Sequence, residues 1–436
     1  MAVPAPAHAT DWTTFGFDDR RTGFNPAETA LGPITARALS HRWSYDMGGV
    51  VNAQPLYAGG MVFAGSERGH VAAIDAQTGV PVWTREVSTV DTVCGDVPEG
   101  VHGVSATPVI DPKRGTIWVS GGDGRVWAFN SATGRTRPGW PVRVGKKAEH
   151  VWGALALASG RLYASTASHC NNAFYRGRIV ALDPSTGRKR GGWRALPRSA
   201  YGGGVWGWGG AAVGGPDRDV FVATANAQGM RSGHTPYAEH VVRLSKRLKF
   251  EQANDPGPPR YDDNDFTGAP ILFRARGCPR QLAVIHKTGQ LFLYDQRRIR
   301  RGPRQRIQVA SEQAFSSLGS YAYWPPERLL YVANGSTGRY SQGLVALRVT
   351  SRCRLRLAWQ QAIGTDPTWP TTPAVANGIV VFGDGSGKTL RAFDALDGTL
   401  LWESGDATGD LYGAPIIADG RVFAPSWDER IHAFGL

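Results

Sequence analysis

Short segments in which apolar and polar residues alternate recur along the whole chain, separated by turns rich in glycine. The segment Thr-Ile-Trp-Val-Ser at 116–120 is typical, and a short apolar run at 107–110 precedes it. Period-two alternation over about five residues predicts a strand, because a helix would repeat its apolar positions about every 3.6 residues. The pattern therefore predicts an all-β protein.

One strand of each unit carries a signature: alanine, an apolar residue and Asp or Asn, then a turn ending in Gly, then Trp. Clear copies occupy 71–79, 126–134, 179–187 and 390–398, and precede Trp83, Trp140, Trp193 and Trp402. Weaker copies lie at 242–244, 293–295, 345–347 and 432–434. Eight copies spaced about 40 to 60 residues apart are typical of propeller blades. We therefore predict an eight-bladed β-propeller with four-stranded antiparallel blades, A to D, in which strand C carries the signature.

The two ends of the chain fit together. The last copy of the signature has no strand D after it, whereas residues 39–45, with Trp43, look like a strand D without a blade. We expect this N-terminal strand to complete the last blade, because ring closure hides edge strands. The prediction is one propeller domain over residues 11–436, preceded by a residual signal or linker at residues 1–10.

The leading segment and the cysteines both favour export of the bacterial type, to the cell envelope or outside. Ala7-His8-Ala9 has the A-x-A pattern of a secretory signal, although an ordinary flexible terminus is the plainer interpretation. In a propeller the D–A and B–C connections share one face (here the top face), and the A–B and C–D connections share the bottom face. By this topology, the cysteines sort into a top-face pair and a bottom-face pair, predicted as bridges Cys94–Cys170 and Cys278–Cys353. Four free thiols in a cytosolic protein are the alternative.

The charge adds one candidate interaction surface. The formal net charge is +13, and only 8 of the 49 basic residues are Lys. The densest basic run, 297–306, could attract an acidic polymer or protein, and a solvated loop is the plainer interpretation. It lacks interleaved aromatic residues, so we expect no nucleic-acid binding. No apolar run approaches the roughly 18 residues that span a bilayer, so we expect no membrane span.

The signature Ala-apolar-Asp-x-x-Thr-Gly-x-x-x-Trp resembles that of the pyrroloquinoline quinone (PQQ) family of propellers, and the resemblance runs from end to end. That family includes quinoprotein alcohol dehydrogenases and cofactor-free scaffolds such as an outer-membrane assembly factor. The repeat therefore indicates the fold, and individual positions must indicate the function. The opening Asp-Trp-Thr-Thr-Phe-Gly at 11–16 is similar to the N-terminal motif of the dehydrogenases.

Five positions resemble the dehydrogenase site. By this resemblance Trp206, in Trp-Gly-Trp, is the floor under the cofactor, and Trp369 is a second cofactor contact. Asn226 matches a calcium ligand, Asp265 the catalytic base beside the calcium, and Lys287 a basic residue next to the quinone. All five lie in predicted top-face connections. The implied cofactors are PQQ and calcium: the cation polarises a quinone carbonyl, the carboxylate removes the substrate proton, and the indole stacks on the ring.

Other positions depart from the dehydrogenase pattern. An adjacent cysteine pair that covers the quinone is replaced by Cys94 followed by Gly, and a cofactor-pairing Arg by Glu99 or His102. A Glu calcium ligand maps near Asn172, and an Asn-Trp pair maps to Ser-Leu at 317–318. The chain has no haem-attachment motif C-x-x-C-H, so an enzyme of this kind would need an external electron acceptor.

Three functional hypotheses follow. The first is a monomeric PQQ-dependent dehydrogenase of an alcohol or a related small molecule. The second is a binding scaffold whose cofactor site has decayed. The third is another metal or cofactor in the top-face pocket, such as copper or zinc. Its candidate ligands, if the cysteines are not paired, are His102, His150, His169, Cys94 and Cys170.

Overall fold

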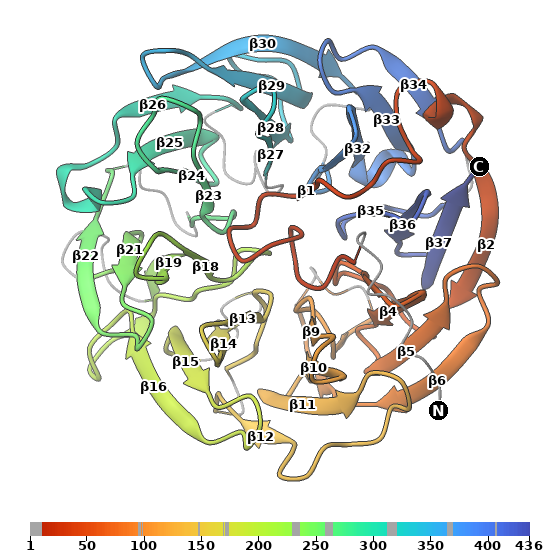
Figure 1. Cartoon of the computed structure of the whole chain (residues 1–436). Coiled ribbons are helices and arrows are strands. Elements are labelled where there is room, and N and C mark those ends of the chain that lie inside the picture. Colours follow the sequence, from red (N-terminus) through yellow and green to blue (C-terminus); the bar gives the residue numbers. More distant parts are fainter. Residues whose placement is uncertain are drawn as a thin grey trace.

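Eight antiparallel sheets stand like blades around a central axis (Figure 1). The computed structural model describes residues 11–94, 97, 99–146, 149–168, 170, 174–228, 236–257, 265–311, 321–363, 369–405 and 408–436. The predicted propeller with eight four-stranded blades is confirmed. Residues 1–10 lie outside the described ranges, and the division into a leading segment and one domain stays a prediction.

Each blade runs from an inner strand A to an outer strand D. The strands of blades one to four are β3 (Leu56–Ala58), β4 (Met61–Gly65), β5 (His70–Asp75), β6 (Pro81–Glu86); β9 (Val109–Asp111), β10 (Thr116–Ser120), β11 (Arg125–Asn130), β12 (Val142–Arg143); β13 (Ala156–Ala158), β14 (Arg161–Thr166), β15 (Arg178–Leu182), β16 (Lys189–Arg194); β18 (Ala212–Gly214), β19 (Asp219–Ala223), β21 (Val241–Leu244), β22 (Phe250–Asn254). Those of blades five to eight are β23 (Ile271–Phe273), β24 (Gln281–Ile285), β25 (Gln290–Asp295), β26 (Gln305–Gln308); β27 (Tyr321–Trp324), β28 (Leu329–Asn334), β29 (Gly343–Val349), β30 (Leu355–Ala362); β31 (Ala374–Ala376), β32 (Ile379–Gly383), β33 (Leu390–Asp394), β34 (Leu400–Glu403); β35 (Ile416–Ala418), β36 (Arg421–Pro425), β37 (Arg430–Gly435) and β2 (Ser40–Asp46). The inner strands of the blades are mostly fully buried. The core is formed by buried side chains that pack between neighbouring blades.

The N-terminal strand closes the ring as predicted. β2 pairs antiparallel with β37, and Trp43 lies opposite Ala433. Two segments from opposite ends of the sequence therefore share one blade, and β2 covers the outer edge of β37.

The signature works as a link between neighbouring blades. In the turn after β5, the side chain of Asp75 accepts hydrogen bonds from the backbone N–H groups of Gln77 and Thr78, at 3.0 and 2.9 Å. Gly79 has φ +72°, and a Cβ there would lie 2.8 Å from the ring of Trp43 in the preceding blade. The indole of Trp43 also donates to a carbonyl of the same turn, Ala76 O, at 3.0 Å. Gly and Trp recur together because the indole of one blade covers the turn of the next.

An unpredicted element closes the channel from the bottom face. Residues 12–25, which include β1 (Phe24–Asn25), cross the centre of the ring (Figure 1) and hydrogen-bond to every blade at or beside its inner strand. The bonded pairs are Trp12 N with Tyr57 O, Thr13 O with Ile110 N, Arg21 Nη2 with Leu155 O, Asp19 O with Val213 N, Arg20 O with Leu272 N, Thr22 O with Tyr323 N, Gly23 O with Val375 N, and Asn25 Nδ2 with Ile417 O. We call residues 12–25 the plug.

A buried arginine anchors the plug. Arg21 is 3% exposed, and its guanidinium donates to Ala211 O, Thr14 Oγ1, Phe15 O and Leu155 O. Burial lowers the pKa of this group to about 10, so it remains charged at neutral pH. The plug therefore occupies the bottom end of the channel.

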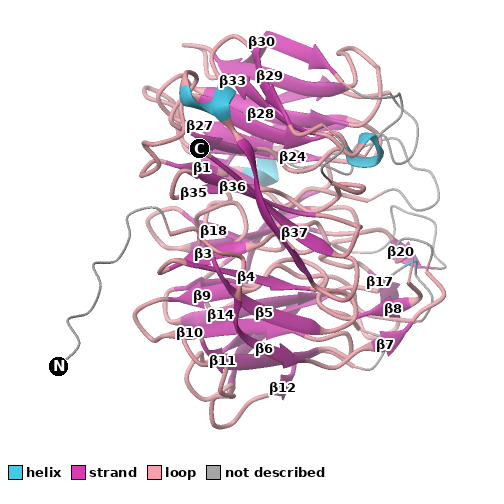
Figure 2. Ribbon diagram, turned by 90° about the vertical axis from the view of Figure 1, so that its right-hand side faces the viewer, coloured by secondary structure: helices cyan, strands magenta, loops and turns pink. Residues whose placement is uncertain are grey.

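The top face carries short additional pairs of strands. β7 (Val90–Asp91) pairs with β8 (Val101–His102), and β17 (Tyr201–Gly202) pairs with β20 (Ala227–Gln228). Figure 2 shows both pairs on the side of the ring opposite the plug. None of the helices in the described ranges is long and apolar enough to cross a membrane.

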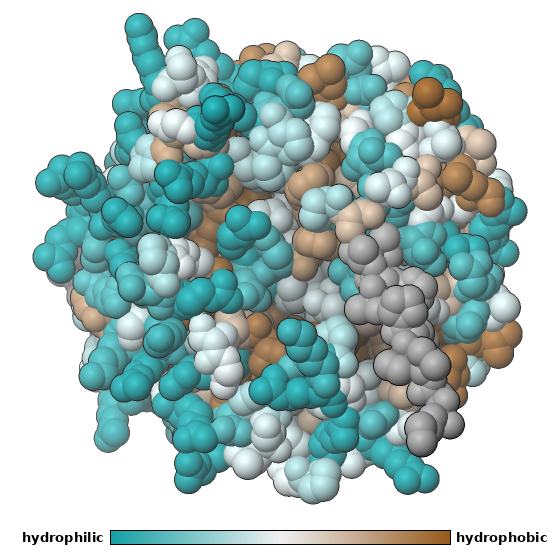
Figure 3. Space-filling view, viewed as in Figure 1, coloured by the Kyte–Doolittle hydropathy of each residue, from teal (hydrophilic) through white to brown (hydrophobic). Residues whose placement is uncertain are grey.

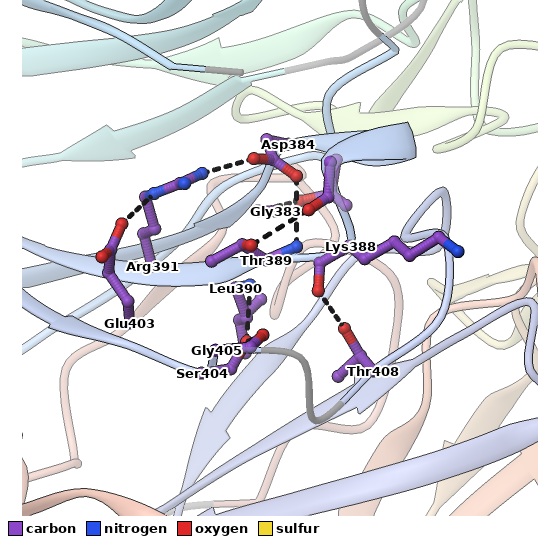
Figure 4. A network of polar contacts seen from close by, with 12 residues as sticks. Gly383, Asp384, Lys388, Thr389, Leu390, Arg391, Glu403, Ser404, Gly405 and Thr408 are labelled. Atoms are coloured by element: carbon purple, nitrogen blue, oxygen red, sulfur yellow. Dashed lines mark hydrogen bonds and ion pairs between the residues drawn. The ribbon is translucent and has the colours of Figure 1, made fainter. Parts of the chain in front are cut away.

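A polar network holds the top-face loop of blade seven. Arg391 on β33 donates to both Asp384 and Glu403, and Thr389 N donates to Asp384 Oδ1 at 3.2 Å (Figure 4). Two backbone bonds then link the loop to its neighbours, Thr371 N to Gly383 O at 3.0 Å and Leu411 N to Gly385 O at 2.9 Å. The network thus fixes the segments beside Trp369 and Tyr412.

Candidate functional site

A buried carboxylate forms the centre of the candidate site. Asp265 is 4% exposed, and its Oδ2 lies 3.1 Å from Lys287 Nζ. Its Oδ1 accepts a hydrogen bond from Asn226 N at 2.7 Å, and its backbone O accepts one from Lys287 N at 2.9 Å. Asn226, Asp265 and Lys287, all predicted site residues, therefore meet at one point. They come from two neighbouring blades, and each lies in a top-face connection close to the end of a strand.

Aromatic rings lie beside this carboxylate. Lys287 Nζ stands 5.2 Å from the ring centre of Trp206, a cation–π distance. Trp152, which the sequence analysis did not single out, contacts both Trp206 and Trp208, with ring centres 5.4 and 6.2 Å apart. Trp206 remains half-buried, so part of its surface is open to a ligand.

The site offers oxygen atoms to a cation. Within the described ranges, the side-chain Oδ1 of Asn226 is buried and has no hydrogen-bond partner. A buried amide oxygen without a donor is costly, and a calcium ion accepts such an oxygen together with carboxylates. With Asp265 beside it and the indole of Trp206 nearby, the residues present fit the predicted pair of a cation and a flat cofactor.

Trp369 lies in a different cluster. It is 43% exposed and packs against Tyr412, which in turn packs against Trp427, with ring centres 5.8 and 4.0 Å apart. No contact within the described ranges joins Trp369 to Trp206 or Asp265. Its predicted role as a cofactor contact stays a prediction.

His102 belongs to a buried network that the sequence analysis missed. His102 and Glu67 are both fully buried, and Nδ1 of His102 lies 3.4 Å from Glu67 Oε2. Ser105 bonds to both of them, and Asn52 Nδ2 donates to Glu67 at 2.8 Å. Burial by itself would raise the pKa of Glu67, but the hydrogen bonds with His102, Ser105 and the backbone N–H of Gly103 lower it below its usual value. The sequence gives no periodic signal for such a network, because its members come from separate connections.

His150 makes the protein sensitive to acid. Burial, and then the neighbouring His102, lower the pKa of His150 to about 4, whereas an unfolded histidine titrates near 6.5. The unfolded chain therefore binds more protons between these pH values, and the free energy of unfolding falls as the pH falls. When the pH falls from 7.5 to 4.5, the free energy of unfolding should fall in both proteins. We expect the fall to be about 2–3 kcal/mol smaller in His150→Gln than in wild type, as measured by urea unfolding. Equal losses in wild type and His150→Gln would contradict the assignment.

Both predicted disulfides are present. Cys94 bonds to Cys170 on the top face, and Cys278 bonds to Cys353 on the bottom face. A copper or zinc site with thiolate ligands would require unpaired cysteines, and all four cysteines are paired. Among the described residues, no group of three His, Cys, Asp or Glu side chains is arranged to hold a metal ion.

Several predicted positions lie outside the described residues. They are Asn172, His169, Gly95 and the pair at 317–318. The proposed third calcium ligand, Asn172, accordingly stays a prediction. Glu99 is described: it accepts hydrogen bonds from Val50 N at 3.0 Å and from Arg68 at 2.7 Å.

The arginine-rich segment 297–306 lies away from the candidate site, in the C–D connection of blade five on the bottom face. It contains η3 (Ile299–Arg301), and its six arginines are exposed. Figure 3 shows hydrophilic side chains crowded over this side of the bottom face, where β22 and β26 lie. Binding of an acidic polymer or protein here stays a prediction.

Comparison with known proteins shows the family of the chain. The profile of the family described as outer membrane protein assembly factor BamB matches residues 34–232 and 356–435. The chain belongs to this family of PQQ-type β-propellers.

Among curated proteins, quinohemoprotein alcohol dehydrogenase from Comamonas testosteroni is 26% identical over 337 residues, 66% of this chain but 45% of that protein. The chain thus spans less than half the length of this relative. Among solved structures, a europium-containing methanol dehydrogenase superposes with a TM-score of 0.79 at 14% identity, over 98% of both chains. BamB from Moraxella catarrhalis superposes with a TM-score of 0.62 at 15% identity, over 91% of this chain and 100% of that one. At such identities the structural likeness shows the fold alone.

Proposed function

We propose that this protein is a quinoprotein-type dehydrogenase that oxidises an alcohol or a related small molecule with PQQ and calcium at the top of the channel. The observation that carries the proposal is the meeting of Asp265, Lys287, Asn226 and Trp206 at one point, where the buried Asn226 Oδ1 has no hydrogen-bond partner among the described residues. The relationship to alcohol dehydrogenases supports an oxidoreductase, and the disulfides support an exported protein.

Each residue has a role that its surroundings support. Asn226 Oδ1 and Asp265 would hold the cation, and the face of Trp206 would support the cofactor and exclude water from below it. When bound, PQQ would supply the hydride acceptor. Asp265 would take the hydroxyl proton of the substrate, and the ion pair with Lys287 orients its carboxylate for that step. Electrons would leave to an external acceptor.

Retention of the cofactor tests the proposal. After incubation with PQQ and calcium chloride and then gel filtration, the wild-type protein should retain the quinone absorption. Trp206→Ala should lose it with little change in melting temperature, because a half-buried ring contributes mainly to the pocket. Trp206→Phe, which keeps an aromatic face, should retain much of it.

The scaffold hypothesis is the second candidate, because the family profile is described by an outer-membrane assembly factor. It predicts that wild type retains no PQQ at any calcium concentration. It also predicts that Trp206→Ala costs stability, since the ring would then serve only as filler in the channel. That pair of results would replace the dehydrogenase proposal.

A further inference from the structure

A second pocket, separate from the channel, lies on blade three. It has a volume of about 790 Å³ and is formed by β15, β16 and the connections that flank them on the top face. Six of its lining residues are basic and none is acidic: Lys146, Arg176, Arg178, Lys189, Arg194 and Arg198.

Most of this charge is uncompensated. Arg178 pairs with Glu149 at 2.6 Å. Within the described ranges, no carboxylate lies in ion-pairing distance of the other five basic groups. Arg176 is nevertheless held in place, because its guanidinium stacks 4.3 Å from the ring centre of Tyr201 and donates to Arg198 O at 2.7 Å. The pocket therefore combines two held guanidinium groups, Arg176 and Arg178, with four basic groups that have no ion-pair partner among the described residues.

The register of the sheet brings like charges together. Arg178 and Arg194 are direct partners across β15 and β16. Like charges at directly opposed positions destabilise an antiparallel pair. The ion pair with Glu149 compensates the charge of Arg178, so a bound anion would chiefly compensate Arg194.

The local sequence leaves room for a ligand. β12 of the neighbouring blade has only two residues, and Val142 packs over the turn at Gly187, where other blades place a Trp. In β16, Gly192 lines the pocket without a side chain. The volume lies in the range of small-molecule sites and exceeds the need of a single phosphate or carboxylate.

We propose that this pocket binds a small multivalent anion that carries two or more phosphate or carboxylate groups. Guanidinium groups suit both, because their planar N–H donors bind such oxyanions in pairs. Phosphate and carboxylate ligands share this chemistry, so the test includes one probe of each kind. The site does not depend on the quinone, and it is tested without PQQ or calcium.

Titration calorimetry with tripolyphosphate and with citrate at about 0.15 M NaCl tests the proposal. We expect wild type to bind at least one probe, and Arg194→Gln to weaken that binding about tenfold or more, as for loss of a charge-assisted hydrogen bond. The matched control is Arg188→Gln, an exposed residue in the turn between β15 and β16 that does not line the pocket.

Two results would overturn the proposal. One is equal weakening by Arg194→Gln and Arg188→Gln, which would reflect the net charge of the protein alone. The other is the absence of binding of either probe to wild type that still gives the circular dichroism of a folded β-protein. Both results leave the quinone site untouched, so failure here is distinct from failure of the proposed dehydrogenase.

Discussion

Deletion of residues 1–46 is expected to produce a chain that aggregates or melts far below the full-length protein. The deletion removes β2, and with it the outer strand of blade eight and the buried ring of Trp43. It also removes the plug, which hydrogen-bonds to all eight blades. Loss of one large buried aromatic side chain alone costs about 3–5 kcal/mol, a large fraction of the stability of a typical domain.

Thermal unfolding followed by circular dichroism, together with light scattering, measures this effect. Deletion of residues 1–10 is the matched control, because it leaves both β2 and the plug intact, and it should melt with the full chain. Trp43→Ala separates the two contributions, since it weakens the closing blade and keeps the plug. A 1–46 deletion as stable as the full chain would show that neither element closes the ring.

Replacement of Asp265 by Asn is expected to lower alcohol-dependent dye reduction by about 100-fold or more, the usual scale for loss of a general base. Asparagine keeps the shape and an oxygen for the cation, so bound PQQ should remain, although more weakly held. Lys287→Ala should instead weaken retention of the cofactor, with a smaller effect on the rate of the loaded enzyme. Asp265→Asn therefore mainly lowers the rate of dye reduction, whereas Lys287→Ala mainly lowers the amount of bound PQQ.

The rate is measured in the steady state with a panel of alcohols and sugars, on protein loaded with PQQ and calcium. Retention of the cofactor is measured by the quinone absorption that remains after gel filtration. Asp217→Asn, at an exposed position on the bottom face, is the matched control and should match wild type. Full activity of Asp265→Asn would remove this carboxylate from the mechanism. Absence of dye reduction by loaded wild type would contradict the dehydrogenase proposal as a whole.

The sequence by itself determined the blades and their closure. The signature could be read because its physics is local: Asp75 caps its own turn, and Gly79 adopts a backbone conformation that other residues avoid. Assignment of strands to faces then sufficed to predict Cys94–Cys170 and Cys278–Cys353, since a short disulfide requires both partners on one face. The same reasoning placed Asn226, Asp265 and Lys287 in one region, where the structure shows direct contacts.

Only the tertiary structure decided the features that depend on contacts between distant segments. The motif at 11–16 did not reveal that residues 12–25 cross the channel, because most bonds of the plug to the blades use its backbone atoms. Trp369 shares a face with Trp206, and only the packing of its neighbours shows that its ring lies against Tyr412. The Glu67–His102 network and the basic pocket of blade three likewise arise where separate connections meet. Periodicity and spacing describe one strand at a time, whereas these sites depend on how the ring brings different strands together.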